Sequence, residues 1–167
     1  MRRIALVFIT AVSAVLLTAT SALADSPHFL SAANSVSSTT GALTTSFKEA
    51  GLGTGVSTVQ INLNADASAL YQCFNNGGNH PKAGNKETVT APVNASGFFP
   101  VRNGQTTSSL SAGPPGQGNF TCPSGQTLFL QSVTYSSTFV SNPPDSSNQF
   151  NATPDPISSG TLHIPVP

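Results

Sequence analysis

Hydrophobic and polar residues alternate along much of the chain, most clearly from Val59 to Cys73. Across these 15 residues the odd positions are apolar and nearly all of the even positions are polar. A period of two is typical of a strand that buries one face and exposes the other, because successive side chains point to opposite faces. The run is longer than most strands, so we expect a bulge near Asp66 to split it.

Shorter segments with the same alternation lie on both sides of this run. They are residues 30–36, 43–47, 89–93, 98–102, 106–112, 127–140 and 162–166. Asn103-Gly104, between two of these segments, is a strong signal for a tight hairpin turn. Both faces of segment 127–140 are apolar at its start, so we expect this strand to begin in the middle of the core.

About eight short strands with frequent turn residues, and no apolar repeat of helical period, predict an all-β protein. The expected architecture is an antiparallel β-sandwich, immunoglobulin-like in arrangement, with a jelly roll as the alternative. We expect residues 25–167 to form this single domain. Residues 142–159 contain four prolines and little apolar patterning, which predicts a surface loop.

The last predicted strand follows that proline-rich loop. Leu162, Ile164 and Val166 share one parity, and burying them would contribute substantially to the stability of a small domain. Pro165 cannot donate a hydrogen bond to a neighbouring strand, so the segment should lie at a sheet edge. We expect residues 160–166 to pair with the domain's own sheet, although the connection is long enough to allow exchange with a second molecule.

Residues 1–24 have the features of a secretory signal peptide. Arg2 and Arg3 precede an apolar run, and the small residues Ala22 and Ala24 mark the expected cleavage site. An uncleaved membrane anchor is the alternative, but the apolar run is shorter than the ~20 residues that cross a bilayer. We therefore expect a secreted protein, outside the cell or at its surface, with no membrane span after cleavage.

Charged residues make up only 7% of the chain, far below the proportion in an ordinary cytosolic domain. After removal of the signal peptide, four Lys and Arg would remain against six Asp and Glu. Binding to nucleic acid through its phosphates needs clustered cations, so we expect no nucleic-acid partner.

The sequence contains two cysteines, Cys73 and Cys122. In an oxidising compartment such a pair usually forms a disulfide, and closing a loop of 48 intervening residues would stabilise the fold by ~3–4 kcal/mol. A reactive thiol would need a Cys-x-x-Cys spacing or a cationic neighbour. The cysteines and the three scattered histidines also fit no zinc-ligand spacing. We expect a structural disulfide.

The segment Phe74–Glu87 is the most distinctive polar stretch and the candidate binding loop. Strand ends flank it, and loops at the end of a sandwich commonly carry binding residues. The alternative is a solvated connection whose Asn and Gly residues supply turn positions. The candidate binding residues are Asn75, Asn76, Asn79, His80, Lys82, Asn85 and Lys86.

The sequence carries no motif for an enzyme active site. It lacks a G-x-S-x-G elbow, an H-E-x-x-H helix and a close pair of acids. We therefore expect no catalytic residue, no metal and no cofactor. Carbohydrate binding often uses exposed aromatic platforms, but Tyr71 and Tyr135 share parity with core residues and should be buried.

Three stretches of the chain resemble small secreted proteins of Gram-positive bacteria, chiefly actinobacteria, that are described only as hypothetical. The stretches are FKEAGLG at 47–53, YQCFNNGGNHPKAGNKE at 71–87 and the later NGQ…GPPGQGNFTCPSGQTLFLQSVTY. The resemblance covers about residues 29–140 and implies export and pairing of the two cysteines. It implies no activity, cofactor or catalytic residue.

These observations favour a secreted, non-enzymatic β-sandwich that serves as a structural or binding module. Its expected partner is a protein of unknown identity or a cell-wall polymer. A secreted inhibitor or effector that acts through residues 74–87 is the alternative, and a hydrolase is the least favoured reading.

Overall fold

The computed structural model describes residues 26–75, 85–143 and 147–166, and within these ranges every regular element is a β-strand. The predicted signal peptide lies outside the described residues. The strands are β1 (His28–Val36), β2 (Leu43–Ala50), β3 (Thr58–Asn75), β4 (Lys86–Pro100), β5 (Thr106–Ala112), β6 (Gln126–Ser141), β7 (Gln149–Asn151), β8 (Ile157–Ser158) and β9 (Ile164–Pro165).

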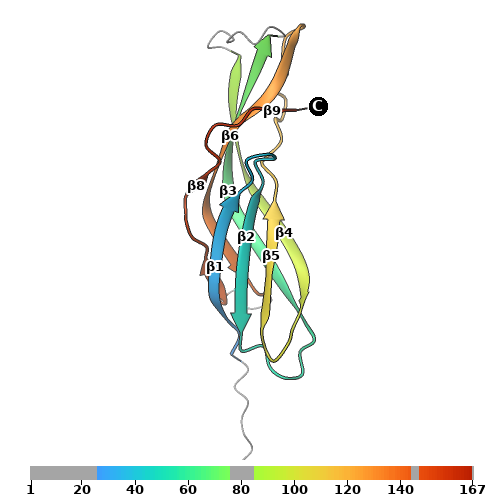
Figure 1. The fold of residues 1–167 in the computed structure, drawn as a ribbon, viewed down its shortest axis with the longest axis vertical. Helices are drawn as coiled ribbons and strands as arrows, with labels where there is room; N and C mark the ends of the chain where they lie inside the picture. The colour runs from blue at the N-terminus through green and yellow to red at the C-terminus, as the bar shows by residue number, and fades with distance from the viewer. Residues whose placement is uncertain (1–25, 76–84, 144–146, 167) are drawn as a thin grey trace, which may run out of the picture.

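The strands form two antiparallel sheets that pack face to face as a β-sandwich, so the predicted fold class is confirmed. The smaller sheet has the order β1-β2-β5. The larger sheet has the order β4-β3-β6-β7, and β8 and β9 also pair with β6. Figure 1 shows the smaller sheet in front of the larger one, and it shows β3 and β6 extending beyond the smaller sheet.

The alternation that predicted β3 is the alternation that builds the core. Every odd residue from Val59 to Cys73 is buried, and each even residue between them faces outward. The inward residues of β2, including Leu43 and Phe47, pack against them from the smaller sheet. Sequestering these apolar side chains from water is the main stabilising contribution to the sandwich.

The expected split of β3 near Asp66 is wrong, because β3 continues as one strand of 18 residues. The irregularity lies opposite, on β6. Asn64 pairs with Phe139 and Asp66 pairs with Ser136, so β6 carries the extra residue of a bulge there. Ser137 adopts a φ of 53°, which lets β6 bend while β3 stays continuous.

The tight turn at Asn103-Gly104 forms, but the long hairpin predicted around it does not. Both turn residues have positive φ, at 53° and 69°, and only Arg102 and Gln105 pair across the turn. Beyond that pair, β4 runs along β3 in the larger sheet and β5 runs along β2 in the smaller one. The turn therefore carries the chain from one sheet to the other.

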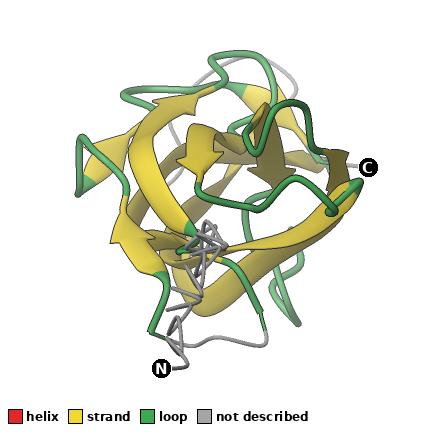
Figure 2. Cartoon of the chain, turned by 90° about the horizontal axis from the view of Figure 1, so that it is seen from below, coloured by secondary structure: helices red, strands yellow, loops and turns green. Residues whose placement is uncertain are grey.

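The proline-rich segment 142–159 is more than a surface loop, because β7 and β8 lie within it. Its middle joins the two sheets along one side. Thr153 N–H donates to Ala32 O (3.1 Å), and Asn34 N–H donates to Thr153 O (2.9 Å), so the segment pairs with β1. Figure 2, which looks along the long axis, shows the strands of the two sheets arranged around that axis.

The C-terminal strand pairs with the domain's own sheet, as predicted. Ile164 lies opposite Leu130 in β6, and Leu162 is buried with 4% of its surface exposed. Phe129 does not enter the core, which corrects the expectation for the start of this strand. Its ring stacks on that of His163 with centroids 3.9 Å apart, and Phe74 packs edge-on against both.

Candidate functional site

The candidate binding loop lies between the end of β3 and the start of β4. Of its seven candidate residues, Asn75 and Lys86 are exposed and Asn85 is half-buried. Asn76, Asn79, His80 and Lys82 fall outside the described residues, so the loop prediction stays open.

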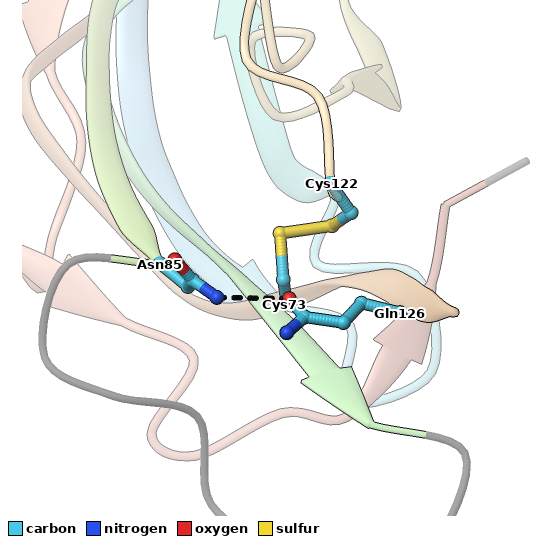
Figure 3. The surroundings of a disulfide bond; sticks show 4 residues. All are labelled: Cys73, Asn85, Cys122 and Gln126. Carbon is cyan, nitrogen blue, oxygen red and sulfur yellow. Dashed lines mark hydrogen bonds between the residues drawn. A yellow bond between two sulfur atoms is a disulfide. The ribbon is translucent and has the colours of Figure 1, made fainter. Parts of the chain in front are cut away.

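Two links fix the base of this loop, and Figure 3 shows both. Cys73 and Cys122 form the expected disulfide, with Cα atoms 5.6 Å apart. Asn85 Nδ2 donates to Gln126 Oε1 (2.9 Å), so the residue that precedes β4 is linked to the start of β6. Cys73 N–H also donates to Asn85 O (3.0 Å). The base of the loop is therefore held by bonds from three strands.

A buried carboxyl, that of Glu49, lies near the C-terminal end of β2, between the two sheets. Glu49 is fully buried, and its Oε1 accepts hydrogen bonds from Asn142 Nδ2 and Asn148 Nδ2, each at 2.8 Å. Its Oε2 has no hydrogen-bond partner. Burial raises the pKa of the carboxyl, while the two amides and the nearby His28 oppose that shift. The contacts give Glu49 a structural role, since they tie the β6–β7 connection to β2.

Both tyrosines are buried, as predicted, and neither forms a platform for a ligand. Tyr135 donates its hydroxyl proton to Gly41 O at 2.7 Å, and Tyr71 donates to the carbonyl of Pro115. Burial raises the pKa of Tyr135 to about 12. These rings belong to the core.

The outer face of the larger sheet carries a set of side chains that we name the amide face. Their strand register brings them together in rows, because directly paired residues point to the same side of a sheet. One row is Gln149, Ser141, Asn62 and Ser96, and the next row is Asn151, Phe139, Asn64 and Asn94. Gln60 and Phe98 face each other beyond them, and with these two rows they complete the amide face.

Two adjoining grooves cross this face between β3 and β4. One has a volume of about 260 Å³ and is lined mainly by Gln60, Asn62, Asn64, Asn94 and Ser96. The second, of about 280 Å³, shares Asn64 and Asn94 with the first and continues to Phe139. The middle of the hollow is thus lined by carboxamides, and its far end is lined by Phe139 together with Asp66 and Ser137.

The amides of this hollow are open to a ligand. Asn64 and Asn94 lie opposite each other, and neither bonds to another side chain anywhere in the described ranges. Gln60 Nε2 makes a long contact of 3.4 Å to Asn62 Oδ1. A free carboxamide offers two donors and one acceptor oxygen, so the floor of the groove can pair with both hydroxyl and carbonyl groups.

Phe98 is the most exposed large apolar side chain of the described residues, with 74% of its surface accessible. Sequence reasoning assigned it to a strand but missed it as a site residue. The signal was available, because Phe98 shares parity with the polar Asn94 and Ser96 and not with the half-buried Val93. An aromatic residue on the polar parity of an amphipathic strand faces solvent.

Within the described ranges, His, Cys, Asp and Glu side chains do not gather in groups of three or more that could hold a metal ion. The same ranges contain no helix long and apolar enough to cross a membrane.

No family model, no curated protein and no solved structure matches this chain.

Proposed function

We propose that the protein is a secreted, non-enzymatic β-sandwich that binds an uncharged polysaccharide of the cell surface through its amide face. The observation that carries this proposal is the exposed ring of Phe98 beside a groove lined by carboxamides. Exposing about three quarters of an aromatic ring to water is energetically unfavourable, and a ligand that covers the ring removes that cost.

The chemistry of the amide face matches the chemistry of a neutral sugar. Carboxamides both donate and accept hydrogen bonds, as the paired hydroxyls of a sugar ring do. The face of a phenyl ring carries negative partial charge, which attracts the weakly positive C–H groups on one side of a pyranose. Phe139 lines one end of the hollow, and Phe98 lies directly opposite Gln60, which lines the other end.

Charge supports a neutral partner over an ionic one at this face. The rows that make up the amide face contain no ionisable residue. The nearest along β3 is Asp66, which is exposed at the far end of the second groove. A surface without charge gains little from steering a charged partner, so hydrogen bonding and stacking set its selectivity.

The signal-like sequence of residues 1–24 and the disulfide support a location outside the cell, because disulfides persist in oxidising compartments. The strand order supports an immunoglobulin-like arrangement over a jelly roll. The first, second and fifth strands form one sheet, and the fourth belongs to the other sheet, at its edge beside the third, with the sixth and seventh beyond. An immunoglobulin-like sandwich with its fourth strand moved to the second sheet has this order.

A secreted inhibitor or effector that acts through residues 74–87 is the second candidate. Its support is the base of that loop, where the disulfide and the Asn85–Gln126 hydrogen bond hold the strand ends in place. A rigid base lowers the entropic cost of presenting a loop to a protein partner.

The test is to measure binding of the purified protein to a β-glucan, a mannan and a xylan by isothermal titration calorimetry. We expect at least one to bind, and Phe98→Ala to weaken that binding about tenfold or more, since the stacking contact of an aromatic ring is lost. Leu30→Ala is the matched control, because Leu30 is 48% exposed but belongs to the smaller sheet.

Three results would contradict the proposal. The first is failure of all three polysaccharides to bind, and the second is equal weakening by Phe98→Ala and Leu30→Ala. The third is concentration-dependent dimerisation that Phe98→Ala abolishes, which would assign the exposed ring to contact with a second copy of the chain.

A further inference from the structure

Two of the three Lys and Arg side chains in the described part of the chain line a single groove at a corner of the sandwich. Lys48 and Arg102 meet there, whereas Lys86 lies at the start of β4, 14 residues from that strand's end at Pro100. The groove has a volume of about 330 Å³, and its other lining residues are Pro100, Gln105, Thr106 and Thr107. Two cations in one groove are unusual for a chain in which only 7% of the residues are charged, so we ask what this groove could bind.

The lining offers a complete set of donors for an anion. A guanidinium presents a planar fork of N–H groups that matches a carboxylate or phosphate, and an ammonium adds a compact charge. Gln105 contributes an amide, and Thr107, which lies opposite Lys48 on the same side of the sheet, contributes a hydroxyl group, whereas the side chain of Thr106 is buried.

No carboxylate lines this groove to neutralise the two cations. The closest acid in sequence, Glu49, points to the opposite face of β2 from Lys48. Its carboxyl is buried and bound by the amides of Asn142 and Asn148. Neither Lys48 nor Arg102 makes a salt bridge to a carboxylate within the described ranges.

The backbone holds the groove in place. Arg102 and Gln105 exchange two backbone hydrogen bonds, at 2.8 and 3.1 Å, across the Asn103-Gly104 turn. Leu52 N–H donates to Gly104 O at 3.0 Å, which ties the turn to the segment that follows β2. Lys48 lies within β2, directly opposite Thr107 of β5. Because the backbone is held in this way, the ordering cost of binding falls mainly on the two cationic side chains.

We propose that this groove is an anion-binding site, distinct from the amide face, for a phosphate or carboxylate group held by Lys48 and Arg102. Either a small free anion or an acidic substituent of a polymer presents this chemistry. The site does not depend on polysaccharide binding at the amide face, because none of its lining residues belongs to that face.

The test is calorimetric titration of the full purified protein with inorganic phosphate and with glucuronate. We expect saturable binding with a dissociation constant on the order of millimolar, which is typical of one anion in an open site. Binding should weaken as the salt concentration rises, because exposed charges are screened. The double variant Lys48→Ala/Arg102→Ala should lose binding, whereas Lys86→Ala, which removes one cation elsewhere, should bind like the wild type.

A third titration with polygalacturonate distinguishes the sources of the anion. Much tighter binding of this acidic polymer than of glucuronate supports a polymer-borne group, and equal binding per carboxylate supports a free anion. The proposal is overturned if neither phosphate nor glucuronate binds saturably. It is also overturned if the double variant, with an unchanged melting temperature, binds as well as the wild type.

Discussion

The two sheets present outer faces of different chemistry. On the smaller sheet the outward residues form a grid of small side chains with a single cation, namely Ser31, Ala33 and Ser35 on β1, Thr44, Ser46 and Lys48 on β2, and Thr107, Ser109 and Ser111 on β5. On the larger sheet the amide face replaces these hydroxyls with carboxamides and adds Phe98 and Phe139.

This difference separates what solubility requires from what binding requires. Short hydroxyl side chains solvate a sheet at small entropic cost, and some bond to each other, as Thr44 and Ser111 do at 2.8 Å. An exposed aromatic ring adds a hydration cost without improving solubility, and carboxamides that do not bond to one another keep their donors and acceptors available. Carboxamides and aromatic rings together form a surface suited to binding a ligand. The outward residues paired in the smaller sheet include neither carboxamides nor Phe rings.

The first prediction concerns the part of the larger sheet that extends beyond the smaller one. Replacing both cysteines, as Cys73→Ala/Cys122→Ala, should lower the free energy of unfolding by ~3–4 kcal/mol, because the unfolded chain regains the freedom of the closed loop. Urea unfolding measures this change. A loss below ~1 kcal/mol would mean that packing of residues 113–121 holds the extension without the disulfide.

The second prediction concerns β9, the C-terminal strand that pairs with β6 in the larger sheet. Deleting residues 160–167 should cost ~2 kcal/mol and lower the melting temperature by several degrees, because Leu162 leaves the core and Ile164 leaves its place beside Leu130. Differential scanning calorimetry measures the change. An unchanged melting temperature would contradict the buried position of Leu162.

The sequence was sufficient to predict the elements whose burial follows a strict alternation. The odd residues of β3 and the inward residues of β2 could be assigned because one parity is apolar throughout. The bulge lies on β6 and not, as the sequence predicts, on β3, because the position of the extra residue depends on the register between the two strands. That register joins segments about 70 positions apart and leaves no local pattern.

The candidate sites were harder to predict for the same reason. The disulfide could be inferred from compartment and cysteine number alone. The amide face could not, because Asn64, Asn94 and Phe139 come together only when three strands align. The groove of Lys48 and Arg102 likewise needs the Asn103-Gly104 turn to carry the chain from one sheet to the other, and the sequence predicts an ordinary hairpin there.

The third prediction concerns the junction between the two sheets. Because burial raises the pKa of Glu49 above its ordinary value of 4.5, the folded protein binds this proton more tightly than the unfolded chain does. The contribution of Glu49 to stability should therefore grow as the pH falls from the raised pKa toward 4.5, and be lost as the pH rises through that window.

Unfolding free energies of the wild type and of Glu49→Gln, measured between neutral pH and pH ~4.5, test this prediction. The difference between the two proteins should shift in favour of the wild type as the pH falls. A difference that is constant over this range, or that shifts the other way, would show that the carboxyl is not destabilised in its charged form.

The fourth prediction compares the two faces directly. Asn64→Ala should weaken polysaccharide binding by about 1 kcal/mol, roughly fivefold, since one net hydrogen bond is lost. Ser46→Ala, at an outward position on the smaller sheet, should leave binding unchanged. Calorimetry with the polysaccharide that the wild type binds best provides both values, and equal effects would remove the distinction between the faces.

The most direct test of the central claim is to map the bound surface. Nuclear magnetic resonance of the labelled protein, titrated with short oligosaccharides of that polysaccharide, reports which backbone amides sense the ligand. Our account predicts saturable shifts at Asn62, Asn64, Asn94 and Phe98, with the outward residues of β1, β2 and β5 unaffected. Shifts confined to the smaller sheet, or to the strand ends around Asn75 and Asn85, would contradict it.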